Sequence, residues 1–395
     1  MISVTTPPAY ILRLGPAGLT VVRALGRCGV SVVALHSDPQ DPAARSRYAR
    51  IRVLPPIGER EDAWLDVLLD EGRRLGSTTA VIFPTGDEGW LFLARHREAL
   101  GRYFRFAMPD ADNLEEWPGK PWQYRVASQA GVPMPRTLFP NTEEEALQAA
   151  ATLGFPCVLK PAHSRRWQAA YGWEKLACPA TVDEFRARWR DATQHGLDLL
   201  VQEYVPGGDN QIYGVYFYVD RRSRPLASGV VRKIRQYPPG FGAGCICTSI
   251  VDPTVTRPIT EMGLRMLQAM RFHGIGGVEF KRDARTGEFK LIEVNVRPGT
   301  MTAVVIDAGL NLPYMAYRDV LGQPVPPPRP LRSGRKVVLI SRDVKSFLYY
   351  HARGELTWWQ WVRSLLGRTR EYYFGWDDPA PFIGQLGRLV RGAID

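Results

Sequence analysis

The sequence predicts an N-terminal α/β domain followed by a larger α+β region, on three observations. Residues 9–36 read as an apolar strand, a glycine turn, an amphipathic helix and a second strand, a pattern typical of a parallel βαβ unit. From residue 199 onward the pattern changes mostly to strands. A proline run, "QPVPPPRP" at 323–330, then separates these strands from a tail rich in tryptophan and arginine.

Length and composition are those of an ordinary globular protein. The 395 residues suffice for two or three domains, and 45% of them are hydrophobic. We expect a cytoplasmic location, because no apolar run approaches a membrane span and the start "MISVTTPPAY" lacks a signal pattern. Five cysteines without CxxC spacing predict free thiols, with neither disulfides nor zinc. The net charge of +11 is scattered along the chain, which favours an anionic substrate over nucleic acid.

The elements follow from periodicity and from their stop signals. The segment "TAVIFPTGDEG" (79–89) predicts a strand that leads into a helix at 90–100, and 142–154 predicts a helix capped by Thr142 and stopped by Gly154. Strands are predicted at 156–161, 199–205, 212–220, 226–237, 274–283 and 289–296, with a helix at 258–270. The predicted domains are 1–117, 118–200, 201–325 and a C-terminal extension at 326–395.

A polar face interrupts the last predicted strand, "KLIEVNVRPGT" (290–300). Alternation places Ile292, Val294 and Val296 on one face and Glu293, Asn295 and Arg297 on the other. The turn "DARTGEF" pairs this strand with 276–283, so that Glu279 can face the same side.

Two carboxylates and an amide oxygen suit Mg²⁺, which characteristically arrives with the phosphates of a nucleotide. The alternative is that the acids only form ion pairs with Arg297, Lys281 or Arg282 on a solvated face.

Upstream segments supply groups suited to a nucleotide. Lys160 ends the buried strand "CVLKP", where a fixed ammonium could neutralise phosphate oxygens. The strand "LLVQEYV" ends at Glu203 before a glycine-rich turn, and backbone groups at such an end can bind an adenine edge.

These motifs together resemble the ATP-grasp superfamily. Lys120 in "WPGKPW", Lys160, the hinge "VQEYVPGGD", the acid of "GGVEFKRD" and the final "LIEVNVRPG" occur in the superfamily's order over residues 10–322. The phrases "ARSRYAR", "FPTGDEG" and "VRKIRQYPPGFG" are most similar to carboxylate–amine ligases, which include D-aspartate ligase-like proteins. The resemblance implies a pre-ATP-grasp domain before the grasp fold, ATP with one or two Mg²⁺ ions (Mn²⁺ as the alternative), and small-molecule carboxylate and amine substrates.

Site roles follow from the resemblance residue by residue. It implies Lys120, Lys160, Glu203, Tyr204, Val205 and Asp209 as ATP contacts, Glu279, Glu293 and Asn295 as metal ligands, and Arg297 as a catalytic candidate. Lys233 is a second catalytic candidate, because the segment "RKIRQYPPGFGAG" could close over the acceptor side; a solvated edge strand is the alternative. Asp87, Glu88, Arg232 and Arg235 are candidate substrate contacts. Asp87 and Glu88 end a predicted parallel strand, where ligands of open α/β sheets gather, although a helix cap explains them equally well.

The chain departs from the family after the second lysine. A glycine-rich loop usually covers the phosphates, whereas this chain has "AHSRRWQAAYGWEK" (162–175) with one glycine. Either Arg165, Arg166 and Lys175 neutralise the phosphates, or the segment is a lid with another role. The residues after "NVRPG" also differ from the carboligase pattern, which leaves the substrate open.

Several alternatives remain open at this level. A small-molecule kinase on the same fold would need no amine. A nicotinamide oxidoreductase would use Gly15, Gly18 and Asp38, but Arg13 stands where the first glycine of the dinucleotide motif belongs. Cys245 and Cys247 could include a reactive thiol. The aromatic, basic tail either packs on its own protein or contacts a membrane peripherally, and a homodimer stays open.

Overall fold

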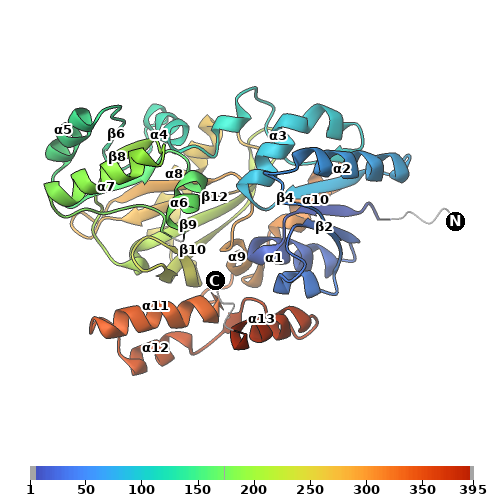
Figure 1. The fold of residues 1–395 in the computed structure, drawn as a ribbon. Coiled ribbons are helices and arrows are strands. Elements are labelled where there is room, and N and C mark those ends of the chain that lie inside the picture. Colours follow the sequence, from blue (N-terminus) through green and yellow to red (C-terminus); the bar gives the residue numbers. More distant parts are fainter. Residues whose placement is uncertain (1–5, 173, 392–395) are drawn as a thin grey trace.

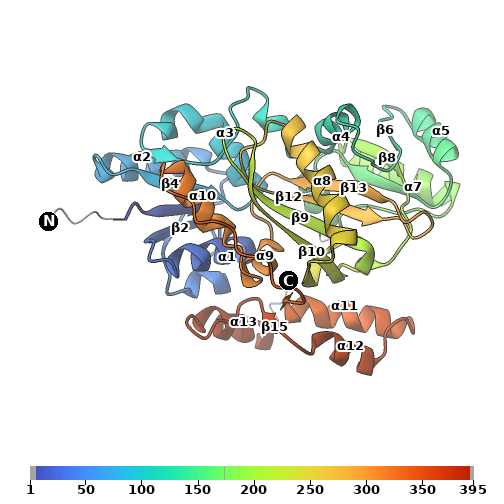
Figure 2. The same cartoon turned by 180° about the vertical axis from the view of Figure 1, so that it is seen from behind.

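The computed structural model describes residues 6–172 and 174–391 and organises them around three sheets (Figure 1). The N-terminal sheet lies at one end of the molecule and a small sheet at the other. A large sheet runs between them, and the C-terminal helices form a layer beneath it, as the view from behind also shows (Figure 2). The α/β domain followed by an α+β grasp region is therefore confirmed.

The N-terminal sheet is parallel, in the order β3-β2-β1-β4-β5. Its strands are β1 (Ala9–Leu12), β2 (Val32–His36), β3 (Ala49–Val53), β4 (Ala80–Pro84) and β5 (Phe104–Arg105), with helices α1 (Gly15–Gly26), α2 (Glu61–Leu75) and α3 (Asp87–Gly101). Helix α1 packs closely on β1, since a Cβ added at Gly18 would stand 2.5 Å from the Arg13 carbonyl oxygen. Gly18 thus serves close helix–strand packing.

The small sheet is antiparallel, in the order β6-β8-β7. It comprises β6 (Thr137–Leu138), β7 (Cys157–Pro161) and β8 (Leu199–Glu203), with α4 (Lys120–Gln129), α5 (Glu143–Leu153), α6 (Ser164–Tyr171) and α7 (Val182–Gln194) around it. The predicted cap of α5 is present, because the Thr142 hydroxyl accepts a hydrogen bond from the Glu145 amide.

Seven strands form the large sheet, in the order β13-β12-β9-β10-β11-β14-β15. They are β9 (Ile212–Val219), β10 (Pro225–Tyr237), β11 (Ala243–Ile250), β12 (Gly274–Arg282), β13 (Phe289–Asn295), β14 (Lys336–Val338) and β15 (Thr369–Glu371). Three helices, α8 (Pro253–Ala269), α9 (Thr302–Asp307) and α10 (Leu312–Val320), accompany it. Short 3₁₀ turns lie at Pro42–Arg45 (η1), Leu114–Glu116 (η2) and Asp209–Gln211 (η3).

The predicted alternation of β13 fails at one position. Glu279 pairs with Glu293, but the next residue, Phe280, pairs with Leu291, so the register shifts at Ile292. Leu291 and Val294 enter the core, whereas Ile292 joins Glu293 in lining a cavity. The prediction that Ile292 shares the apolar face is therefore wrong, because a bulge leaves the extra residue out of the alternation.

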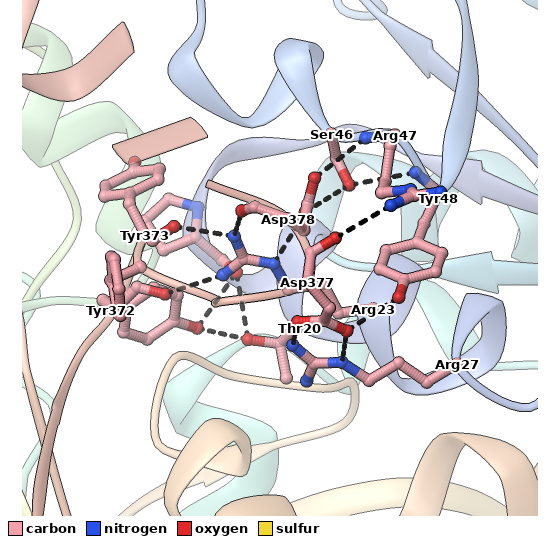
Figure 3. Close-up of polar contacts among 12 residues, drawn as sticks. Thr20, Arg23, Arg27, Ser46, Arg47, Tyr48, Tyr372, Tyr373, Asp377 and Asp378 are labelled. Atoms are coloured by element: carbon pink, nitrogen blue, oxygen red, sulfur yellow. Dashed lines mark hydrogen bonds and ion pairs between the residues drawn. The ribbon is translucent and has the colours of Figure 1, made fainter. Parts of the chain in front are cut away.

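The C-terminal extension is attached to the large sheet and to the N-terminal domain. Its strands β14 and β15 extend the large sheet, and its helices are α11 (Ile340–Ala352), α12 (Trp358–Leu365) and α13 (Ala380–Val390). Asp378 accepts hydrogen bonds from the Arg23 Nε, the Ser46 hydroxyl and the Arg47 amide (Figure 3). Within the described residues, no helix combines the length and apolarity needed to cross a bilayer.

Candidate active site

A cavity between the small sheet and the large sheet collects most of the predicted nucleotide contacts. Its charged lining comes from both sheets and from the segment after α6. The lining includes five lysines and three glutamates: Lys120, Lys160, Lys175, Lys233, Lys281, Glu203, Glu279 and Glu293. The five lysines outnumber the three glutamates, and Glu203 is already paired with Lys290. The cavity lining therefore carries a net positive charge, which suits a polyphosphate.

Lys160 is fixed at the end of β7. Its Nζ donates a hydrogen bond of 3.1 Å to the Tyr124 hydroxyl, and that hydroxyl donates in turn to the Ile292 carbonyl oxygen. Burial lowers the pKa of Lys160 to about 8, against a smaller opposing effect of Glu293. Burial likewise lowers the pKa of Lys120. Two partly desolvated ammonium groups are therefore held at the cavity, where phosphate oxygens would stabilise their charged forms.

Nucleotide affinity should consequently depend on pH through Lys160. Phosphate favours the ammonium form, so affinity should be nearly full at pH 7, fall to about half at pH 8, where half of the lysine is protonated, and be about tenfold lower at pH 9. Lys160→Arg should flatten this dependence, because guanidinium stays protonated, and Lys160→Ala should weaken ATP binding at every pH. Calorimetric titration at pH 7, 8 and 9 measures this, with Lys345→Ala on α11 as the control; an unchanged affinity of Lys160→Ala would contradict the role.

The hairpin β12–β13 brings the predicted metal ligands together. Glu279 and Glu293 are cross-strand partners, and the Asn295 Nδ2 lies 3.5 Å from the Glu279 Oε1. Lys233 Nζ lies 3.1 Å from the Glu279 Oε2, with both side chains buried. Burial would raise the pKa of Glu293, but Lys175, Lys120, Lys233 and Arg297 outweigh it, so the pKa lies below the ordinary value and Glu293 is a carboxylate.

The donor set fits Mg²⁺ bound together with a nucleotide. Among the described residues no group of three or more His, Cys, Asp and Glu could enclose a metal ion by itself. Magnesium usually takes one or two carboxylates and completes its shell with water and substrate phosphates. Glu279, Glu293 and the Asn295 side-chain oxygen match that incomplete shell.

Apolar side chains also line the cavity and suit a base. Tyr204 and Val205 follow β8 and line the cavity with Val158, Leu176 and Ile292. The Glu203 carboxylate points into ion pairs, with its Oε1 2.9 Å from Lys290 Nζ. We therefore expect an adenine base to contact the backbone at 203–205 and these apolar side chains. The Glu203 side chain is not needed for that contact, because it pairs with Lys290.

Two predicted contacts, Asp209 and Arg235, are corrected by their hydrogen bonds. Asp209 is buried and accepts from the Gln236 amide, the Gly240 amide and the Tyr350 hydroxyl, so its carboxylate holds the 236–240 loop and has no oxygen turned to a ribose. Arg235 forms a buried two-bond pair with Asp343 of α11.

Arg232 lies across from Tyr213 and Thr248, on the opposite strand face from Lys233. A substrate contact by Arg235 is not supported, because its guanidinium is paired with Asp343. A contact by Arg232 at this cavity is not supported either, because Lys233, on the opposite strand face, is the residue that lines it.

The ends of β4 and β13 meet at a charged contact. Arg297 Nε donates a 2.9 Å hydrogen bond to the Asp87 Oδ1, and Asp87 keeps half of its side chain exposed. A Cβ added to neighbouring Gly86 would stand 3.1 Å from Arg13 Nη1, so a second guanidinium approaches the same turn. Glu88 follows at the start of α3. Because β1 and β4 flank the point where the strand order reverses, this is where open α/β sheets bind ligands.

The segment after α6 supplies a lysine to the site. Lys175 lines the cavity, and burial lowers its pKa, with Glu293 opposing. Arg166 is exposed, and the side chain of Arg165 lies outside the described residues. Ile292, Gln236 and Lys281 also line the cavity. The sequence pattern did not predict the first two, and it predicted Lys281 only as an ion-pair partner of the acids. The signal for Lys281 was its position two residues after Glu279, on the same strand face.

Two alternative chemistries lose support. Burial raises the pKa of the Cys247 thiol to about 12, and that of Cys245 well above its ordinary value, so neither is a ready nucleophile. At the start of α1, the Asp41 carboxylate accepts from the Gly15 amide at 3.1 Å and pairs with His36. A side-chain anion thus occupies the place where a dinucleotide pyrophosphate would bind.

Comparisons with known proteins agree with this geometry. A family model described as "ATP-grasp in the biosynthetic pathway with Ter operon" matches residues 252–342. D-aspartate ligase of Enterococcus faecium is 24% identical over 296 residues, covering 72% of this chain and 70% of that protein. D-alanine–D-alanine ligase of Pseudomonas putida is 28% identical over 178 residues, covering 44% of this chain and 53% of the relative. The chain thus aligns with about half the length of that relative.

A solved structure shows the same fold. The ATP-analogue complex of biotin carboxylase from Campylobacter jejuni has a TM-score of 0.65 and 16% identity, covering 83% of this chain and 74% of that one.

Proposed function

We propose that this chain, which belongs to the ATP-grasp superfamily and is related to its ADP-forming carbon–nitrogen ligases, activates a small carboxylate with ATP and joins it to an amine. The carboxylate oxygen would attack the γ-phosphorus, giving an acyl phosphate and ADP. The amine nitrogen would then attack the acyl carbon, releasing phosphate and leaving an amide.

One observation carries this proposal: two adjacent carboxylates on β12–β13 line the same cavity as several lysines and a set of apolar side chains. Glu279 and Glu293 bear the negative charges, and Lys120, Lys160 and Lys175 bear positive charges from the facing elements. Phosphoryl transfer needs mainly positioning and charge neutralisation, which this arrangement supplies without a covalent nucleophile. Mg²⁺, when bound by Glu279, Glu293 and Asn295, would neutralise charge on the phosphate oxygens.

The substrate side of the proposal rests on the contact between Asp87 and Arg297. Arg297 lies two residues beyond Asn295, so its guanidinium can reach from the metal ligands toward the N-terminal domain, where it meets Asp87. The relatives' names point to amino acids as substrates. An amino acid carries both a carboxylate, which suits Arg297, and an ammonium, which suits Asp87.

Trapping with hydroxylamine tests the reaction class. With ATP, Mg²⁺ and the correct carboxylate, hydroxylamine should replace the amine and give a hydroxamate, phosphate and one ADP per turnover. A screen of carboxylates by ADP release and hydroxamate colour identifies the acid, and an amine library then identifies the second substrate. A phosphorylated product stable to hydroxylamine, formed without any amine, would instead assign a small-molecule kinase.

Substitutions of Asp87 and of Arg297 should change different kinetic constants. Asp87→Asn should raise KM for the amine while leaving KM for ATP unchanged, because Asp87 lies outside the nucleotide cavity. Arg297→Met should lower kcat by about 10²-fold, as expected for loss of one charge-stabilising group. Steady-state kinetics with each substrate varied in turn measures both, with Asp70→Asn on exposed α2 as the control. Equal effects of Asp87→Asn on both KM values would mean that Asp87 only orients Arg297.

A further inference from the structure

An amphipathic stripe runs along the outside of helix α12. Trp359, Val362, Arg363 and Leu366 recur at the three- and four-residue spacing that places side chains on one helix face. Trp359 is 68% exposed and Leu366 is 57% exposed. The helix buries none of its residues, and its inner side rests on α11 through stacking of Trp361 on Phe347.

The same layer contains most of the exposed apolar surface. Ten of the fifteen large hydrophobic side chains found exposed among the described residues lie between positions 348 and 390. On α13, Ile383, Leu386 and Val390 form a second stripe, and Val390 is 88% exposed. Such a concentration on one layer indicates an interaction surface, since scattered single residues would need no explanation. Figures 1 and 2 show α11, α12 and α13 together at one side of the molecule, with α12 outermost.

The charge around the α12 stripe indicates which kind of surface it binds. From Leu356 to Arg370 the chain contains three arginines and no acidic residue. Arg363 and Arg368 are exposed, so their guanidinium groups flank the apolar side chains. A two-fold contact between copies would bring these like charges face to face. An anionic lipid surface would instead accept both the tryptophan and leucine side chains and the guanidinium groups.

We propose that α12, with α13 beside it, docks the protein on an anionic membrane surface. The helix would lie in the plane of the interface, with Trp359, Val362 and Leu366 among the acyl chains and Arg363 and Arg368 at the lipid phosphates. Helix α11 connects this surface to the catalytic region, because Tyr349 lines a groove together with Lys175 and Phe241, which also line the nucleotide cavity. Docking would therefore hold the cavity close to the membrane.

Vesicle flotation of the full chain tests this surface. The protein should float with vesicles of equal phosphatidylglycerol and phosphatidylcholine at low salt, and should dissociate as ionic strength rises. Arg363→Gln and Arg368→Gln should each weaken binding about fivefold, the effect of one basic group near an anionic surface. Trp359→Ser combined with Leu366→Ser should abolish flotation.

The controls make each outcome decisive. Phe139→Ser removes an aromatic group that is 48% exposed on the small-sheet side and should leave flotation unchanged. Thermal unfolding should be unaffected in all these variants, because the replaced side chains are exposed. Absence of flotation, or equal binding to pure phosphatidylcholine and anionic vesicles, would overturn the proposal. So would a concentration-dependent dimer that disappears in the Trp359→Ser variant, because the surface would then be a contact between copies.

Discussion

The Glu293→Gln variant is expected to lose at least about 10²-fold in turnover while remaining folded. Glutamine keeps the shape of the side chain but removes the charge that balances Lys175, Lys120 and Lys233, and it offers a weaker ligand to Mg²⁺. The fold should persist because Val294 and Leu291, on the core side of β13, are unchanged. ADP release under saturating substrates measures the loss, and circular dichroism with thermal unfolding measures the fold.

Glu288→Gln is the matched control for this variant. Glu288 is exposed in the turn that joins β12 to β13, so the same chemical change on the same hairpin should leave turnover unchanged. The Mg²⁺ concentration needed for half-maximal activity should rise in Glu293→Gln and stay constant in Glu288→Gln. Wild-type turnover by Glu293→Gln would show that the metal assignment is wrong.

The Asp378→Ala variant is expected to lose about 3–5 kcal/mol of stability, the usual result of leaving one partner of a buried ion pair uncompensated. Arg23 and Asp378 are 4% and 1% exposed, and their Nε and Oδ2 atoms lie 2.9 Å apart. Arg23 also donates to the carbonyl oxygens of Tyr372 and Tyr373 (Figure 3). Loss of the carboxylate leaves the guanidinium buried without a counter-charge between α1 and the chain that precedes α13.

Asp377→Ala is the natural comparison, because it removes the neighbouring acid. Asp377 pairs with Arg27 at 2.7 Å, but these side chains are 42% and 39% exposed, so the expected cost is about 0–1 kcal/mol. Chemical denaturation compares the two variants, and limited proteolysis reports release of the C-terminal segment. The double variant with Arg23→Met and Asp378→Ala should lose less stability than the sum of the two single variants, because it leaves no guanidinium buried without a counter-charge. Similar stabilities of Asp378→Ala and Asp377→Ala would contradict this account of the contact.

Much of the site could be read from the sequence because its residues follow regular elements. Lys160 ends a strand with a clear apolar pattern, and Glu279, Glu293 and Asn295 alternate along a hairpin with an obvious turn. Periodicity fixes the face of a side chain in such elements. It failed at Ile292, where a bulge breaks the count, and at Arg235, where the register of β10 shifts. The partners of Arg235 and Asp209, which are Asp343 and Tyr350, belong to a helix more than 100 residues away.

The fold class, the order of the motifs and the polar face of "KLIEVNVRPGT" could be predicted from local pattern alone. Which charges line the cavity and which hold the protein together depends on tertiary packing. Lys233 and Arg235 stand two residues apart on one strand, yet the first turns to Glu279 in the cavity and the second to Asp343 in the core. The role of a buried charge is set by the counter-charge that packing brings to it, and no spacing along the chain contains that information.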